Sequence, residues 1–323
     1  MKVMVLGATG FIGPAVMRAL AKLGHDPLGV ARRAPEGAAA HAVLALDRGD
    51  AAAVARAVLA EDVGVVVDLL AMTEASTQPL LAALSGRIGR YVLASSGDVY
   101  RRYGALTRKE RDPDPARRLA EDAPLRTTRF PYRTDPRRPA GDPAAWMDDY
   151  DKIPIEQAAR AQADLPAVIA RLPMVWGPGD RYGRFNWAIE PMLRGAARLT
   201  MDEAWAAWRT TYGYVDDVAH ALALCATHPA AAGIYNLGAT DAPDHAHWAE
   251  RFAAVIDWQG GFDTLSRREV AAPLRARLDA MDLSVAMVTD TGKIRAELGF
   301  SEVVDPTDAL ARTVIAEGER LGA

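Results

Sequence analysis

The sequence predicts an α/β protein with a doubly wound parallel sheet, followed by a smaller C-terminal domain. Short apolar runs alternate with segments of helical periodicity from residue 2 to residue 172. A glycine-rich turn joins the first run to the first helical segment, and the 323 residues are enough for two domains. Such alternation is typical of a parallel sheet that helices cover on both faces, with ligand sites at the carboxyl ends of the strands.

The first predicted elements are a strand from Lys2 to Leu6 and a helix from Pro14 to Gly24. Pro14 fits a first helical turn because its missing N–H would have no partner there. The turn between them reads GATGFIG, and its glycines allow the backbone to approach a pyrophosphate at the helix N-terminus. We therefore predict a Rossmann dinucleotide site, with these cofactor-binding residues: Gly7, Thr9, Gly10, Phe11, Ile12 and Gly13.

The alternation continues along the chain. Further strands are predicted at residues 28–31, 42–46, 63–70, 90–94 and 167–172, and helices at 51–59 and 78–84. We expect a Rossmann domain over residues 1–176, with a basic insertion at 101–145, and a mainly substrate-binding domain over 177–323. Residues 212–238 are expected to return to the first domain. The aromatic residues of 181–209 are expected either to line a pocket or to form core.

The end of the second strand indicates the cofactor. An acidic residue about 20 positions after the glycines normally binds the adenosine ribose. Here Arg32 and Arg33 occupy that place, and guanidinium groups suit a 2′-phosphate. We therefore predict NADP(H), with NAD(H) as the alternative. Asp47, just after the third strand, either accepts a hydrogen bond from the adenine amine or caps the turn before Ala51.

Composition narrows the class of protein. The chain carries 38 Lys and Arg against 42 Asp and Glu, a net charge of -4, which argues against general binding of nucleic acid. The single cysteine, Cys225, forbids an intrachain disulfide and fits a reducing compartment. No apolar run approaches the roughly 20 residues of a membrane span, and the first residues do not form a signal peptide. We expect a cytoplasmic protein without a membrane or nucleic-acid partner.

Several motifs at predicted strand ends carry a family resemblance. They read GATGFIG at 7–13, SSGDVY at 95–100, GPGD at 177–180, YVDDVA at 214–219, YNLG at 235–238 and TGKIRAELGF at 291–300. Together they resemble the extended short-chain dehydrogenase/reductase superfamily, in its NAD-dependent epimerase/dehydratase branch. The resemblance covers nearly the whole chain. It implies hydride exchange between a nicotinamide and a carbon that bears a hydroxyl or carbonyl, and it implies a homodimer.

The resemblance also implies catalytic residues. A serine matched by Ser96 hydrogen-bonds the reacting oxygen, and a tyrosine acts as the acid or base. A lysine four residues later holds the nicotinamide ribose and lowers the pKa of the phenol. Lys152 and the family's following glutamate, Glu156, are present, but Asp148 stands where the tyrosine is expected. Tyr150 lies only two residues before Lys152, so on a regular helix the two side chains would diverge by roughly 200°.

Three interpretations of this departure remain open. In the first, Tyr150 reaches the site from an irregular segment before the helix, which Pro154 supports because proline fits a first helical turn. In the second, Asp148, Tyr100 or Tyr103 transfers the proton instead. In the third, the redox chemistry is lost and the protein only binds its cofactor.

The insertion between Ser96 and Asp148 is basic. Residues 101–140 hold eleven arginines and one lysine against six acidic residues, a net charge of +6. We predict a lid over an anionic substrate, with Arg126, Arg129 and Arg133 as its substrate contacts, together with the neighbouring aromatic rings of Phe130 and Tyr132. The alternative is a solvated basic loop or a subunit contact, and a basic loop with interleaved aromatic residues also leaves RNA binding open as a minor alternative.

These observations predict an NADP(H)-dependent oxidoreductase or epimerase-like enzyme. Its substrate would be a small hydroxylated or anionic metabolite, such as a nucleotide sugar. Ser96, Lys152 and Tyr150, or Asp148 in its place, would form the active site. The alternative is a cofactor-binding sensor or scaffold without turnover. No metal site is predicted, because His245 and His247 fit a solvated helix start.

Overall fold

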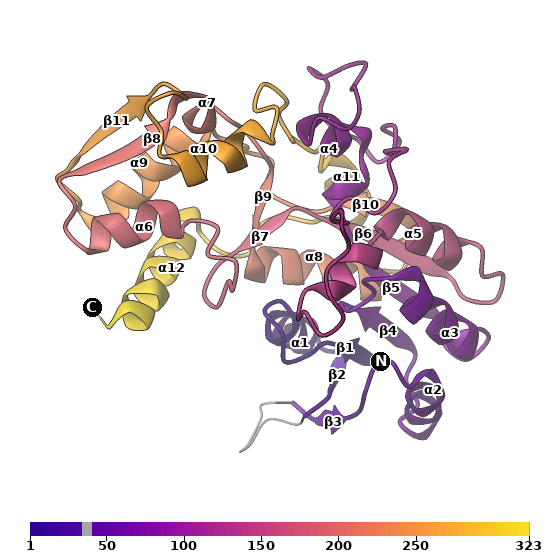
Figure 1. The fold of residues 1–323 in the computed structure, drawn as a ribbon. Coiled ribbons are helices and arrows are strands. Elements are labelled where there is room, and N and C mark those ends of the chain that lie inside the picture. Colours follow the sequence, from indigo (N-terminus) through magenta and orange to yellow (C-terminus); the bar gives the residue numbers. More distant parts are fainter. Residues whose placement is uncertain (34–40, 323) are drawn as a thin grey trace.

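The computed structural model describes residues 1–33 and 41–322. Within them, seven strands form one all-parallel sheet in the order β10-β6-β5-β4-β1-β2-β3 (Figure 1). The strands are β1 (Lys2–Leu6), β2 (Asp26–Ala31), β3 (Val43–Ala45), β4 (Val65–Asp68), β5 (Arg90–Ser96), β6 (Ala167–Leu172) and β10 (Gly233–Asn236). The predicted doubly wound parallel sheet is confirmed.

Helices cover both faces of the sheet. They are α1 (Gly13–Lys22) and α8 (Val215–Thr227) on one face, and α2 (Ala51–Ala60), α3 (Glu74–Leu84) and α5 (Lys152–Arg160) on the other. Strand β1 shows why both faces are covered. Val3 and Val5 belong to the core beneath α1 and α8, whereas Met4 and Leu6 belong to the core beneath α2 and α3. Alternate residues of a strand point to opposite faces, so a strand that is apolar throughout needs a helix layer on each side.

The helix α3 begins earlier than the sequence predicts. It starts at Glu74 rather than at Gln78, because the Thr73 hydroxyl accepts a hydrogen bond from the Ser76 N–H and caps the helix. Pro79 lies inside the helix.

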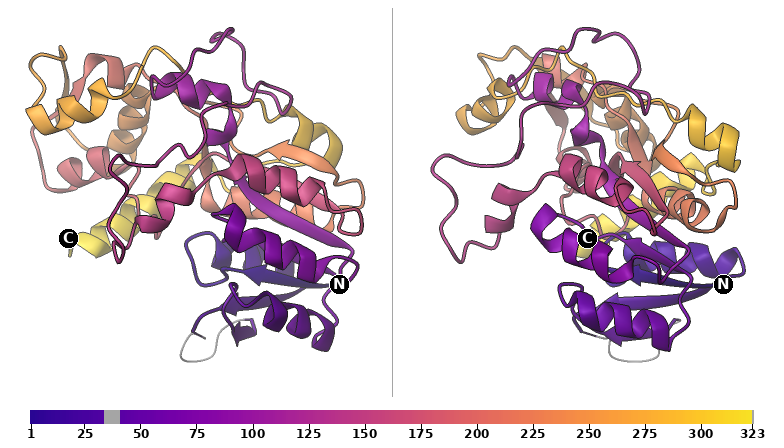
Figure 2. Two further views of the ribbon diagram at one scale, coloured as in Figure 1. Left: turned by 45° about the vertical axis from the view of Figure 1, so that its right-hand side comes forward. Right: turned by 90° about the vertical axis from the view of Figure 1, so that its right-hand side faces the viewer.

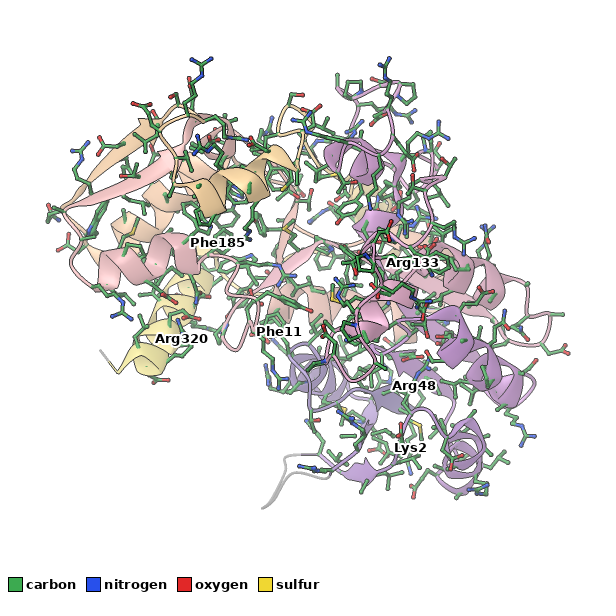
Figure 3. All side chains as sticks on the ribbon, viewed as in Figure 1. Lys2, Phe11, Arg48, Arg133, Phe185 and Arg320 are labelled. Atoms are coloured by element: carbon green, nitrogen blue, oxygen red, sulfur yellow. The ribbon has the colours of Figure 1, made fainter. Side chains whose placement is uncertain are left out.

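A second lobe contains most of the chain after Trp176. Its elements are α6 (Asn186–Leu193), β8 (Arg198–Asp202), α7 (Glu203–Ala206), α9 (His245–Ile256), β11 (Gly261–Leu265), α10 (Ala272–Asp279) and α12 (Pro306–Leu321). Phe185 lies within this lobe, while Phe11 lies where the two lobes meet (Figure 3). Phe185 packs on Trp248 with ring centroids 4.7 Å apart, and both side chains are buried. Most of the predicted aromatic cluster is therefore core.

His245 belongs to this aromatic core, so the prediction of a solvated helix start is wrong for it. Its side chain is fully buried between Trp205 and Trp208, and its Nε2 lies 3.0 Å from the Tyr212 hydroxyl. Burial lowers the pKa of the imidazole to about 4. Only His247 is exposed at this helix start.

The chain returns to the first lobe after Thr211. Strand β7 (Met174–Trp176) pairs in parallel with β9 (Tyr212–Tyr214), helix α8 packs on α1, and β10 joins the edge of the large sheet. Helix α11 (Gly292–Leu298) packs near this edge. Between β5 and α5 lies the insertion, with the turn η1 (Gly97–Val99), the helix α4 (Arg101–Leu106) and the turn η2 (Ala145–Asp149). Figure 2 shows it as a long loop that leaves the body of the lobe and returns at α5.

Candidate cofactor cleft and active site

The glycine turn between β1 and α1 forms a tight backbone cradle. Gly7 has a φ of +94°, a conformation that favours glycine. A Cβ atom on Gly13 would lie 2.2 Å from the carbonyl oxygen of Gly7, so only glycine fits there. Helix α1 begins at Gly13, and its first N–H groups have no partner within the helix. This geometry fits the pyrophosphate of a dinucleotide.

A cleft of about 520 Å³ opens beside this turn, at the carboxyl ends of the central strands. The glycine turn and the ends of β4, β5 and β6 form its floor. The insertion and the loop after β7 contribute its outer walls. The side chains that carry chemistry in its lining are Ser95, Ser96, Asp98, Tyr132, Trp146, Tyr150, Lys152, Tyr182 and Arg184.

Tyr150 and Lys152 line this cleft together, although they are only two residues apart. Tyr150 lies outside the helix, with φ of -67° and ψ of 125°, and Asp151 is also extended. Helix α5 begins at Lys152. Alternate residues of an extended segment point to the same side. Tyr150 and Lys152, two residues apart, can therefore face the same cleft, as residues four apart do on a helix.

Lys152 is held by the backbone rather than by the phenol. Its Nζ donates to the carbonyl oxygens of Ala71, at 2.7 Å, and Ala94, at 2.8 Å. Burial lowers the pKa of the ammonium to about 8, against the opposing charges of Asp68 and Asp98.

Asp98 connects two tyrosines at the back of the cleft. Its Oδ2 accepts hydrogen bonds from the hydroxyls of Tyr150, at 2.9 Å, and Tyr132, at 3.0 Å. The other oxygen, Oδ1, is buried without a partner among the described residues. Burial raises the pKa of the carboxyl. Burial and the neighbouring charge of Asp98 raise the pKa of the Tyr150 phenol well above its usual value.

The other proton-transfer candidates lie outside the cleft lining. The Asp148 carboxylate accepts hydrogen bonds from the N–H groups of Thr134, at 3.1 Å, and Arg138, at 2.7 Å, and from the Arg138 guanidinium. The Tyr100 hydroxyl donates to Asn236 at 2.6 Å. Tyr103 packs edge-on against a neighbouring ring of the insertion. The structure therefore places Tyr150, and not these residues, beside Ser96 and Lys152.

The three arginines predicted to contact substrate are engaged elsewhere. Arg126 is buried and forms an ion pair with Asp151 at 2.8 Å. Arg129 pairs with the same carboxylate at 2.6 Å. Arg133 donates to the backbone oxygen of Asp148, and Figure 3 shows it on the insertion. None of the three lines the described cleft, so the geometry does not favour the predicted lid over an anion.

Acidic residues just beyond the basic segment explain this outcome. Residues 101–140 have a net charge of +6, but three acidic residues, Asp148, Asp149 and Asp151, follow shortly after them in the chain. Arg137 and Arg133 both pair with Asp149. The arginines thus fasten the insertion to the segment before α5, and this places Tyr132 and Trp146 in the cleft.

The residues predicted to bind the adenosine end of the cofactor follow β2 and β3, the two strands beyond β1 in the sheet. Arg32 and Arg33 follow β2 and are exposed. No carboxylate stands at this strand end before residue 34, where the described segment stops. The Asp47 carboxylate accepts a 2.8 Å hydrogen bond from the Gly49 N–H, so it caps the turn before α2.

Ser95, Asp98, Trp146 and Arg184 line the cleft but were not singled out from the sequence, whereas Tyr182 belongs to the aromatic segment expected either to line a pocket or to form core. Asp98 had a usable signal, because it lies within the SSGDVY motif, two residues after Ser96. Trp146 had none, because a large aromatic side chain is more often buried. Among residues 1–33 and 41–322, no group of three His, Cys, Asp or Glu side chains is placed to hold a metal ion. In the same residues, no helix combines the length and apolar character that a membrane crossing needs.

The fold and this cleft define a dinucleotide-binding protein of the Rossmann type. Residues 3–134 and 152–238 match the NAD dependent epimerase/dehydratase family. The chain belongs to this family, as the motifs predict, and membership supports a nicotinamide cofactor. The unmatched residues 135–151 contain the altered segment with Asp148 and Tyr150.

Comparisons with individual proteins agree with the fold. The chain is 27% identical, over 264 residues, to the 3-diazoavenalumate denitrifying reductase of a Streptomyces species, covering 79% of this chain and 82% of the relative. An epimerase-type protein from Burkholderia cenocepacia superposes with a TM-score of 0.71 and 24% identity, covering 98% and 97% of the two chains. The UDP-glucose 4-epimerase of Thermus thermophilus, in complex with NAD, gives 0.67 and 21%, covering 98% of each chain.

Proposed function

We propose that the protein is an NADPH-dependent reductase of a small carbonyl metabolite. The observation that carries this proposal is the position of the Tyr150 hydroxyl, which lies in one cleft with Ser96 and Lys152 and is hydrogen-bonded to Asp98. The first interpretation of the altered motif is thus the one that the geometry supports.

The environment of Tyr150 keeps its phenol in the protonated form. Burial and the charge of Asp98 raise the pKa of the phenol, so it holds its proton at neutral pH. A reductase needs such a donor for the oxygen that becomes a hydroxyl, whereas the oxidation that begins an epimerase cycle needs a base. The relative from Streptomyces is also named a reductase, which supports the same direction.

The other cleft residues have complementary roles. A bound cofactor in its reduced form would supply the hydride. The Ser96 hydroxyl is placed to hydrogen-bond the substrate oxygen, and Lys152 is placed to hold the ribose hydroxyls. Asp98 accepts hydrogen bonds from the hydroxyls of Tyr150 and Tyr132 and thereby orients the proposed donor.

The preference for NADPH rests on Arg32 and Arg33. Both are exposed at the end of β2, where a 2′-phosphate would find two guanidinium groups. We also propose a cytoplasmic homodimer, as the family resemblance implies. Light scattering during gel filtration tests the dimer, because a monomer at micromolar concentration would contradict it.

Oxidation of NADPH with a panel of aldehydes and ketones tests the reaction. We expect turnover in the wild type, and a loss of at least about 100-fold in kcat for Tyr150→Phe, with cofactor affinity kept within about twofold. Tyr235→Phe is the matched control, because Tyr235 is bonded to Glu297 away from the cleft. If no carbonyl is reduced while NADPH still binds, the reductase proposal is overturned and a sensor or scaffold is the better description.

A further inference from the structure

We propose that the substrate carries an aromatic ring, which the cleft holds against Trp146 and Tyr182. The identity of the reacting group rests on the proposed reductase function. The recognition of the ring does not, because it follows from the lining of the cleft and can be measured without turnover.

Exposure singles out these two side chains. Trp146 is 43% exposed and Tyr182 is 79% exposed, and among the described residues they are the only large aromatic side chains in the exposed class. Both line the same cleft, although they come from separate segments, the insertion and the loop after β7. Covering an exposed aromatic surface with a ligand removes it from water and lowers the free energy. Two such side chains at one cleft therefore indicate a binding site.

The aromatic surface leads to the proposed proton donor. The ring of Trp146 lies 6.2 Å from that of Tyr150, edge to face, and the ring of Tyr132 lies 5.2 Å from Tyr150 on another side. Leu70, which is also exposed, lines the same cleft. A planar ring stacked on this wall would bring its substituent toward the Tyr150 hydroxyl and Ser96.

The charges of the cleft argue against a diphosphate in the substrate. Its described lining contains two cationic side chains, Lys152 and Arg184. Lys152 is bonded to two backbone carbonyls. Arg184 pairs with Asp180 at 2.9 Å and stacks over the ring of Tyr182. Asp98 adds a buried acidic group. A nucleotide sugar would therefore find no uncommitted cation for its phosphates, whereas a neutral aryl compound needs none.

A pair of unreactive ligands of similar size that carry the same amide group tests the proposal. Benzamide and cyclohexanecarboxamide differ in the aromatic character of the ring, and calorimetry gives the Kd of each for the NADPH-loaded protein. We expect benzamide to bind about tenfold more tightly, because only its ring stacks on Trp146 and Tyr182. Equal affinities would overturn the proposal, as would binding of UDP-glucose that is tighter than that of benzamide.

Variants at Trp146 and Tyr182 test whether these two side chains cause the preference for benzamide. Trp146→Leu keeps an apolar side chain but removes the ring, so the preference for benzamide should fall to about twofold or less. Trp146→Phe should restore most of it, and Tyr182→Leu should reduce it. Leu274→Ala is the control, because Leu274 is similarly exposed but lies on α10 outside the cleft. A preference that survives both leucine variants would place the ring elsewhere and contradict the proposal.

The same experiments separate this proposal from the reductase function. If benzamide is preferred but no carbonyl consumes NADPH, the ring site stands and the reductase function fails. If Tyr150-dependent reduction occurs but the two amides bind equally, the reductase stands and the aryl substrate is overturned.

Discussion

The Tyr150 hydroxyl donates a 2.9 Å hydrogen bond to Asp98, a residue 52 positions earlier in the chain. Both side chains are buried. The family resemblance implies a lysine that lowers the pKa of the tyrosine. In this protein the nearest charged partner of the phenol is a carboxyl group, and the pKa is raised instead. The altered segment therefore keeps Tyr150 in the cleft, where burial and the Asp98 carboxyl raise the pKa of its phenol.

The charge of Asp98 sets the alkaline limit of activity. A proton donor is lost as pH rises through its pKa, and burial together with the charge of Asp98 keeps the pKa of Tyr150 high. Asp98→Asn keeps the shape but removes the charge, so the pKa should fall. We expect the alkaline limb of the kcat profile to move to lower pH.

Asp149→Asn is the control for this prediction. It also removes a carboxylate near the insertion, but Asp149 pairs with Arg133 and Arg137 and does not line the cleft. Its alkaline limb should coincide with that of the wild type. If the Asp98→Asn profile keeps its alkaline limb as well, Tyr150 is not the group that sets it.

Lys152 makes stability depend on pH. Its pKa is about 8 in the folded protein, against 10.5 for an ordinary lysine side chain in water, so between these values the unfolded chain binds more protons. The contribution of Lys152 to stability therefore rises from pH 8 upward and is lost as pH falls to 8. Compared with Lys152→Met, the wild type should gain about 2 kcal/mol in free energy of unfolding between pH 8 and 9.5.

Urea unfolding of the two proteins without cofactor measures this difference. The Cys225 thiol, whose pKa burial raises to about 12, opposes the trend above pH 9 but is present in both proteins. Lys22→Met, at an exposed lysine of α1, should run parallel to the wild type at every pH. A constant difference between wild type and Lys152→Met would show that Lys152 keeps an ordinary pKa.

Local patterns were enough to predict the sheet and the glycine turn. Val3 to Leu6 are apolar at every position, and such a run next to GATGFIG has few alternatives. The role of the arginines was harder to predict. Arg126 and Asp151 are 25 positions apart, and no local pattern indicates that a fold will bring them to 2.8 Å.

The position of the Tyr150 side chain depends on the residue at which helix α5 begins. A helix that began two residues earlier would turn Tyr150 away from Lys152. The observed helix begins at Lys152 because Asp151 caps it, accepting a hydrogen bond from the Ile153 N–H. Pro154 favours a helix that starts near this point but does not determine its first residue. Boundaries are the least certain part of a sequence prediction, and this site depends on one.

Arg32 and Arg33 should determine the choice of cofactor. If they bind a 2′-phosphate, the double variant Arg32→Ala/Arg33→Ala loses affinity for NADPH by about tenfold or more and keeps its affinity for NADH. Fluorescence titration with each cofactor measures both. Arg56→Ala, at an exposed arginine of α2, should change neither affinity. A wild type that binds NADH more tightly than NADPH would contradict the prediction.

Arg126 should act on stability rather than on substrate affinity. Its guanidinium and the Asp151 carboxylate are both 1% exposed, and Arg126 also donates to the backbone oxygens of Asp98 and Thr128. Arg126→Ala removes one of the two cations on the buried Asp151 carboxylate, which Arg129 still pairs, and leaves those backbone oxygens without their donor, so it should lower the free energy of unfolding by about 1–3 kcal/mol. Arg133→Ala removes an arginine that is 37% exposed and should cost less than about 1 kcal/mol. Urea denaturation compares the two variants. If Arg126→Ala is as stable as Arg133→Ala and raises KM for an anionic substrate, the role predicted from the sequence holds and the structural role does not.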